Sequence, residues 1–349
     1  MDVKEKINIM ESTLSNSQYI TKNRLQKFLK QNNYYRDDNS DYYQIINQQL
    51  ISNFEEAMLQ LQEYEYDKSY KYFSLYRFNN EDIEEIIKKK EEQCKFNDKK
   101  IDFWSKTKLD KPTLKKYSDS IDIKFTIVLS DKEKCNVKIK YIIIATIFIK
   151  EKLISIKYYS ISDEFYDNEF YININNKAKS WIESNLNISL IEFDSMKVYK
   201  KLYKEIKENP IKYKNESIHS ILMDDEMNGR SYFKASDTEM LPFLGRLLEL
   251  SNEFKSEEDK NKLRLYIHRY EEEAIIRNIA IKWKNRFLNS RGRLGHITVG
   301  INKVYSVNNE DDSIKYAFTL HHIRQNEGVN RERINYVIKY LSRYLEENK

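Results

Sequence analysis

The chain has 349 residues, of which 40% are hydrophobic and 33% charged, and its formal net charge is +5. This composition excludes a disordered chain and leaves room for two or three domains with cores of their own. The most apolar run, 141–149, is shorter than the roughly 20 residues of a membrane helix, and two isolated cysteines exclude a disulfide framework. Because the first ten residues also lack an apolar signal core, we expect a cytoplasmic protein with no membrane partner.

Residues 1–118 are expected to form a helical region. Apolar side chains recur at three- and four-residue steps between Asp41 and Tyr64, which is typical of a helix with one buried stripe. A second helix is expected over 81–87, where acidic residues follow a candidate N-cap at Asn79-Asn80. The segment 106–116 contains Pro112 and is expected to end the region.

Residues 119–230 are expected to form an antiparallel α+β domain, because the apolar period changes to two near Ser118. Four short strands joined by charged turns indicate a meander with one central strand buried on both faces. Two helices are expected to follow, the second ending before Pro210. The expected strands are 121–127, 137–149, 153–161 and 165–174, and the expected helices are 176–186 and 195–208.

Residues 231–349 are expected to form a third region of helices and one hairpin. The expected order is a helix over 241–254, a long buried helix over 257–289, a hairpin of 296–307 with 314–320, and a closing helix from Asn330. The sequence therefore predicts an α+β fold in three parts: a helical N-terminal region, a central meander sheet with helices, and a basic C-terminal domain.

The positive charge is concentrated near the carboxyl end. Residues 276–349 hold 14 Lys and Arg against 7 Asp and Glu, so this part alone carries +7. The run 286–300 places glycines and arginines at a predicted turn, where backbone N–H groups and guanidinium groups can meet an anion. The same run also suits an ordinary helix end, where glycine and basic residues are common.

A basic region of this kind favours a nucleic-acid partner, bound through its phosphates with weak sequence preference. Tyrosines alternate with basic residues on the predicted closing helix, which suits occasional stacking on bases. The expected nucleic-acid contacts are Arg286, Arg291, Arg293, His296, Arg324, Arg331, Arg333, Tyr336, Tyr340 and Arg343.

The leading hypothesis is a non-enzymatic or accessory nucleic-acid-binding subunit that works with other protein subunits. The AT-rich codon bias associates such a chain with bacterial mobile elements or antiviral (anti-phage) defence. One alternative is a protein-interaction subunit whose basic part docks an acidic partner. Another is a divergent metal-dependent nuclease or phosphodiesterase acting through His296 or Asp194. No catalytic residue, metal ligand or cofactor is predicted, because histidines, cysteines and carboxylates lack a familiar ligand spacing.

Overall fold

The computed structural model divides the chain into two compact units. The first comprises Met1–Phe193 with Asn330–Glu332, and the second comprises Asp194–Val329 with Arg333–Lys349. The structure describes residues 1–16, 18–35, 41–79, 82–106, 108–134, 136–167, 169–224, 230–234, 247, 249–273, 275–288, 294–307, 313–324 and 330–346. The division into three domains expected from the sequence stays a prediction. The boundary between the two compact units lies after Phe193.

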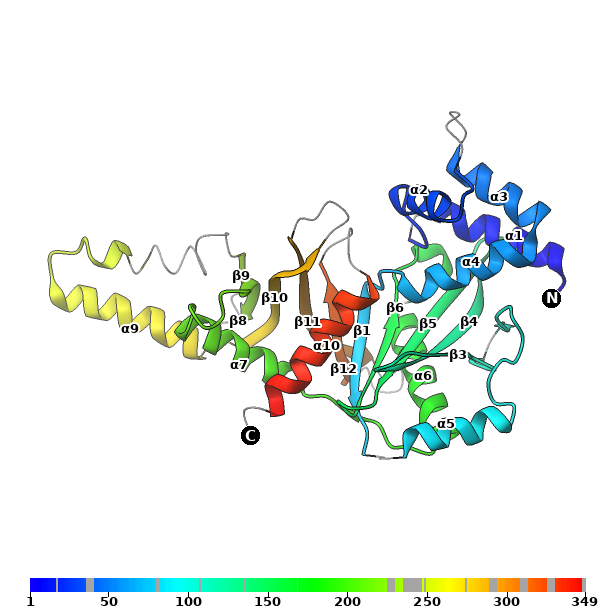
Figure 1. The fold of residues 1–349 in the computed structure, drawn as a ribbon. Coiled ribbons are helices and arrows are strands. Elements are labelled where there is room, and N and C mark those ends of the chain that lie inside the picture. Colours follow the sequence, from blue (N-terminus) through cyan, green and yellow to red (C-terminus); the bar gives the residue numbers. More distant parts are fainter. Residues whose placement is uncertain are drawn as a thin grey trace. The chain divides into compact units, whose positions relative to one another are not determined.

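The first unit combines helices with a largely antiparallel sheet (Figure 1). Its helices are α1 Val3–Ser15, α2 Lys22–Gln31, α3 Tyr42–Ser52, α4 Phe54–Asp67, α5 Ile83–Glu92 and α6 Phe170–Leu186, with a 3-10 turn at Asp163–Phe165. Its strands are β1 Tyr72–Arg77, β2 Trp104–Ser105, β3 Thr113–Lys116, β4 Ile121–Ser130, β5 Lys138–Phe148, β6 Leu153–Tyr158 and β7 Ile191–Glu192.

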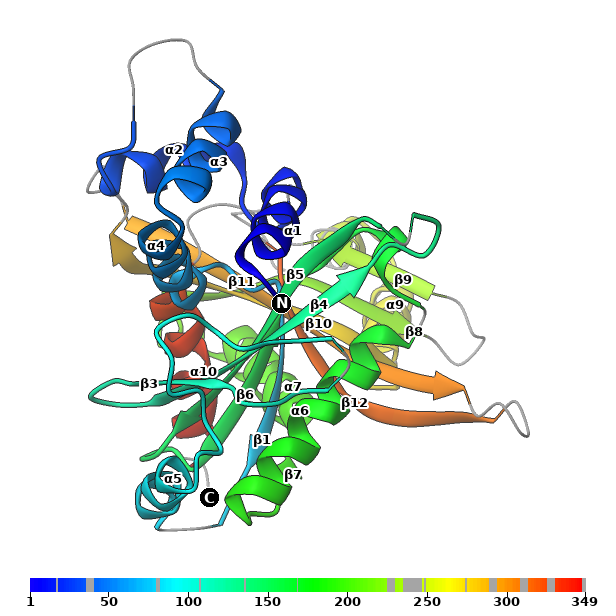
Figure 2. The ribbon, with the colours of Figure 1, turned by 90° about the vertical axis from the view of Figure 1, so that its right-hand side faces the viewer.

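The sheet of the first unit is built on the order β4-β5-β6-β1, with antiparallel pairing throughout. Helices cover both of its faces: α1 and α4 lie on one side of β4–β6 and α6 on the other (Figure 2). On β4, Lys124 points to α4 whereas Phe125 meets Trp181 of α6, as the alternation of a strand requires. Because of this double cover, β4 is buried from Ile121 to Val128.

The α+β class predicted from the sequence is confirmed, and so are the strands that became β4, β5 and β6. The fourth strand expected over 165–174 is wrong, because α6 already begins at Phe170. Its place beside β6 is taken by β1, from the region expected to be helical. The stripe 41–64 is confirmed as helical, although Asn53 divides it into α3 and α4. The helix expected from residue 81 starts at Ile83, and Asp82 stands at its N-cap.

The second unit also pairs helices with an antiparallel sheet (Figure 1). Its elements are α7 Ser195–Glu208, β8 Glu216–Asp224, β9 Arg230–Lys234, α9 Glu257–Glu273, β10 Ile275–Leu288, β11 Leu294–Val307 and β12 Ile314–Ile323. The last helix, α10 Arg331–Glu346, belongs to this unit from Arg333 onward. The strand order is β12-β11-β10-β8-β9. Asp194 caps α7, because its carboxylate accepts a hydrogen bond from the Lys197 N–H at 3.1 Å.

One face of this sheet carries the core of the second unit. Trp283 of β10 is fully buried and contacts Tyr199 of α7 and Tyr340 of α10. The apolar residues of β10 and of the neighbouring strands that share this face are Ile279, Ile281, Ile297, Val299, Ile301 and Ile323, each at most 2% exposed. Since α7 and α10 both pack here, the alternate residues of the same strands lie on the opposite face.

The helix expected from 257 to 289 is wrong in its second half. The helix α9 ends at Glu273, and Ile275–Leu288 forms the strand β10. The apolar residues that suggested a second helical stripe are instead spaced by two along a half-buried strand. The predicted hairpin is confirmed as β11 and β12, and the closing helix as α10. Of the helix expected over 241–254, residues 241–246 and 248 lie outside the described residues, and 247 and 249–251 are helical. No helix within the described ranges is long and apolar enough to cross a membrane.

Candidate nucleic-acid interface

The face of the second sheet opposite α7 and α10 is polar and basic. The pairing register places Lys234 of β9 beside Ser220 of β8, and Lys282 of β10 beside Thr298 of β11. Lys234 is exposed and Lys282 is half-buried. Two β-bulges, at His219 of β8 and Arg277 of β10, interrupt the pairing of these strands. Bulges redirect side chains, so both residues deviate from plain alternation.

Arg324 directly follows β12 and extends its side chain over this face. Its guanidinium donates to Ser220 Oγ at 2.8 Å, to the Tyr232 hydroxyl at 2.9 Å and to Asn278 Oδ1 at 3.0 Å. All three acceptors are uncharged, so they orient the guanidinium without cancelling its charge.

Small residues make the room that Arg324 occupies. A methyl group at Gly300 would lie 3.2 Å from Arg324 Nε and 3.3 Å from the Cβ of Ala280. Contacts this close are tighter than ordinary packing, so any side chain at residue 300 would push the guanidinium aside. The close approach of Arg324 is therefore the reason for a glycine at residue 300.

Two titratable groups report the positive potential on this face. The pKa of His219 is lowered by burial and by repulsion from Arg324, Lys234 and Lys282. Burial raises the pKa of the Tyr232 phenol, but hydrogen bonds from Ser220 and Arg324 and the charge of Arg324 outweigh it and leave that pKa below its usual value. We call His219, Lys234, Lys282 and Arg324, with the exposed ring of Tyr232, the cationic face.

The nucleic-acid contacts predicted from the sequence lie in several different parts of the structure. Arg324 lies on the cationic face, and His296 of β11 lies close enough to His219 to act on its pKa. Arg291 and Arg293 lie outside the described residues, and of Arg286 only the backbone, within β10, is described. Arg343 is exposed on α10.

Arg331 belongs to the core of the first unit. Its Nε donates to the buried Asp122 carboxylate at 3.0 Å, its terminal nitrogen donates to Ser120 at 2.8 Å, and its guanidinium lies 3.6 Å from the ring centre of Tyr117. Only 15% of the Arg331 side chain is exposed and Asp122 opposes its charge, so Arg331 is poorly placed to bind a phosphate.

Arg333, Tyr336 and Tyr340 serve the packing of α10 in the second unit. Arg333 is 7% exposed and donates to the backbone carbonyl of His296 at 3.0 Å. The ring of Tyr336 meets Phe287, and that of Tyr340 meets Trp283. These three residues pack between α10 and the sheet, on the side away from the cationic face.

Sequence reasoning missed His219, Lys234 and Lys282. His219 and Lys234 lie on β8 and β9, which were not expected as strands, and Lys282 was assigned to a helix. The usable signal was alternation: Lys282 and Ala280 interleave with Ile279, Ile281 and Trp283, which marks a strand with one polar face.

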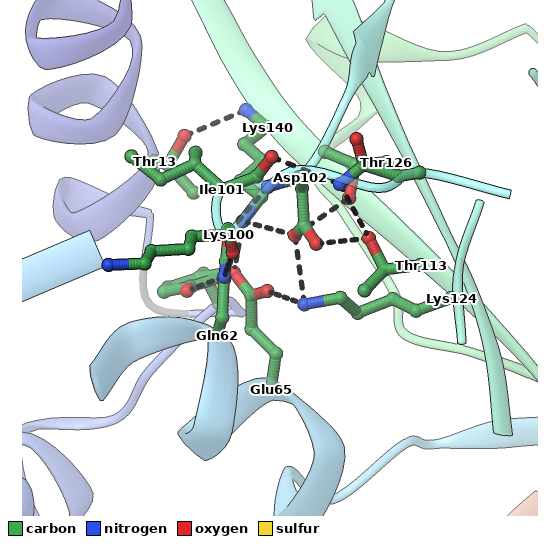
Figure 3. A network of polar contacts seen from close by, with 12 residues as sticks. Thr13, Gln62, Glu65, Lys100, Ile101, Asp102, Thr113, Lys124, Thr126 and Lys140 are labelled. Atoms are coloured by element: carbon green, nitrogen blue, oxygen red, sulfur yellow. Dashed lines mark hydrogen bonds and ion pairs between the residues drawn. The ribbon is translucent and has the colours of Figure 1, made fainter. Parts of the chain in front are cut away.

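The first unit contains a buried ionic network that the sequence did not reveal (Figure 3). Lys124 of β4 bridges Glu65 of α4 at 2.9 Å and Asp102 at 2.8 Å, and Lys140 of β5 reaches Glu65 at 2.6 Å. None of these four side chains is more than 1% exposed. Gln62 of α4 completes the network by accepting from the Asp102 N–H at 2.7 Å.

The carboxylates and lysines of the network pair with one another. Burial alone would raise the pKa of Asp102, but Lys124 and Lys140 hold it at about 2. The same lysines lower the pKa of Glu65 against the effect of its burial, and the pKa of Lys124 is raised by Asp102 and Glu65 although its burial acts the other way. Because both carboxylates stay charged at neutral pH, the network joins α4, β4, β5 and the segment at Asp102, and we treat it as structural.

Of the two residues considered for a nuclease or phosphodiesterase, Asp194 is the N-cap of α7, and His296 lies on β11 close to His219. Within the part of the chain that is described, no three His, Cys, Asp or Glu side chains gather as a metal site would need. Comparison of the chain with protein-family models, with curated proteins and with solved structures finds no match.

Proposed function

We propose that this protein is a nucleic-acid-binding accessory subunit, and that it binds single strands on the cationic face of its second unit. The observation that carries the proposal is the gathering of Lys234, Lys282 and Arg324 around His219 on a sheet face opposite the packed helices. Cations on one surface attract a phosphate backbone and release its counterions.

The shape of the face favours a single strand. A sheet surface admits splayed bases, which stack on aromatic rings while phosphates meet the surrounding cations. Tyr232 is 54% exposed and stands beside Arg324, so a base can stack next to a fixed guanidinium. Polar groups along the face, including Asn302, can accept and donate hydrogen bonds without selecting one base strongly.

The test is a salt titration of binding. A labelled single-stranded oligonucleotide of about 16 nucleotides, with hydroxyls at both ends, is titrated with protein and followed by fluorescence anisotropy. Affinity should fall as salt rises. The double variant Lys234→Gln with Lys282→Gln should bind more weakly and reduce the slope of log K against log salt by about 1.4, because each phosphate contact on a single strand contributes about 0.7.

The matched control is Lys88→Gln with Lys89→Gln on α5, which removes two exposed lysines from the first unit. This control should leave both affinity and slope unchanged. Equal weakening by the two double variants would show that the contact is not on the cationic face. Absence of salt-sensitive binding, with capture of an acidic protein instead, would favour the protein-interaction alternative.

A further inference from the structure

The second sheet forks at its middle. Strands β10 and β11 pair from Leu288 and Leu294 down to Asn278 and Asn302, and their pairing ends there. Beyond this point β10 continues beside β8 as far as Ile275, while β11 continues beside β12 as far as Val307. The two asparagine side chains hydrogen-bond to each other where the strands separate.

A pocket of about 640 Å³ lies at this fork, within the size range of small-molecule sites. Its lining includes five cationic side chains: Lys200 of α7, Arg230 of β9, Arg277 of β10, Lys303 of β11 and Arg324. Tyr232 and Tyr305 add two aromatic rings to the wall, both of them more than two-fifths exposed.

One carboxylate holds two of these cations in place. Asp224 accepts from Arg277 Nε at 2.7 Å and from Arg230 Nε at 3.0 Å. A terminal nitrogen of Arg230 also donates to Asp224, at 3.4 Å. The side chains of Arg277 and Arg230 are 48% and 67% exposed, so part of each guanidinium group still faces solvent. Among the side chains that the structure describes here, five cations stand against this one carboxylate, which makes the fork positive, and planar guanidinium groups suit two-point recognition of phosphate.

We propose that the fork binds the terminal phosphate of a nucleic-acid strand that lies on the cationic face. Tyr232 and Arg324 belong to both the face and the fork, so a strand crossing the face runs directly into the pocket. A terminal phosphate monoester carries a charge of about −1.5 to −2 at neutral pH, whereas an internal phosphodiester carries one negative charge. A pocket with this excess of cations therefore favours the end of a strand over its middle.

This inference rests on the proposed function, and the experiment separates the two. Three single-stranded oligonucleotides of one sequence, bearing a 5′-phosphate, a 3′-phosphate or two terminal hydroxyls, are compared by fluorescence anisotropy. One phosphorylated form should bind about tenfold more tightly than the hydroxyl form, which is the effect of one added charge-assisted contact. The preferred end gives the direction of the strand on the face.

The discriminating variant is Arg277→Gln with Lys303→Gln, which changes two exposed side chains of the fork. It should abolish the preference for the phosphorylated end while keeping most of the affinity for the hydroxyl oligonucleotide. The matched control, Lys234→Gln with Lys282→Gln, should weaken both oligonucleotides and preserve their ratio. Lys200→Gln, on α7, gives a second variant of the fork that leaves the strands intact.

The outcomes distinguish failure of the terminal-phosphate site from failure of the proposed function. Equal affinity for all three oligonucleotides, with salt-sensitive binding retained, would overturn the terminal-phosphate site and leave the cationic face standing. A preference that survives both fork variants would place phosphate recognition elsewhere and also overturn it. Failure of every oligonucleotide to bind would refute the proposed function, and this inference with it.

Discussion

Lys157 of β6 gives the first unit a stability that depends on pH. The side chain is 3% exposed, and burial, together with repulsion from Arg331, lowers its pKa to about 8 although Asp122 opposes the change. In the unfolded chain the same amine titrates near 10.5. Between these values the unfolded state binds more protons than the folded state, so stability rises with pH.

The expected size follows from the two pKa values. The penalty for charging Lys157 in the folded protein is about 3 kcal/mol below pH 8 and disappears above the unfolded pKa. From about pH 7 to about pH 9.5, this group alone should add about 2 kcal/mol to the free energy of unfolding. Lys157→Met removes the titrating amine, so the variant should lack this gain.

The assay is urea unfolding at several pH values, followed by hydrogen exchange of peptides from β5 and β6, which report the first unit. The quantity of interest is the difference in the free energy of unfolding between wild type and Lys157→Met. It should change by about 2 kcal/mol over the range. The same measurement on Lys177→Met, which replaces an exposed lysine of α6, is the control. A difference that stays constant with pH for Lys157→Met would refute the assignment of a lowered pKa to this lysine.

Three further changes test other features. Arg331→Leu removes the guanidinium that faces the buried Asp122 and should lower the free energy of unfolding of the first unit by about 3 kcal/mol in urea titration; a loss no larger than that of a surface substitution would contradict the pairing. Asp102 has a pKa of about 2 in the folded state against 3.8 unfolded, so about 2 kcal/mol of stability should be lost as pH falls through this window. In Asp102→Asn that acid-induced loss should be missing, as followed by circular dichroism, and an unchanged acid transition would exclude Asp102 as its source. Gly300→Ala should displace Arg324 and raise the pKa of the Tyr232 phenol in an ultraviolet titration; an unshifted phenol would show that the guanidinium tolerates the methyl group.

The strands of the first unit were predictable because apolar residues alternate along them. The burial of the polar residues that lie between these apolar residues was not predictable. Alternation in β4 predicts that Asp122, Lys124 and Thr126 face water. In the structure all three are buried, because α1 and α4 cover that face. Glu65 and Asp102 supply charges opposite to that of Lys124. Arg331 supplies the charge opposite to that of Asp122. These partners come from segments distant in the sequence, and a local pattern cannot show them.

In the second unit, the spacing of apolar residues alone did not distinguish a helix from a strand. Apolar residues of β10 fit two helical stripes as well as one strand face, and only pairing with β8 and β11 settles the choice. The candidate site depends on the same pairing, because Lys234, His219 and Lys282 meet only across neighbouring strands. The sequence indicated that the carboxyl end is basic; which cations share a surface was decided by strand register.

The position of residues 330–332 bears on how the protein can be made and divided. These residues belong to the first unit, yet they follow its other residues by more than a hundred positions in the chain. On the ribosome, Asp122 must therefore remain without its guanidinium partner until Arg331 has been synthesised, 209 positions later. A truncated product that stops at Phe193 keeps that carboxylate buried with its arginine missing, and Asp122→Asn should restore some of the solubility that such a fragment loses.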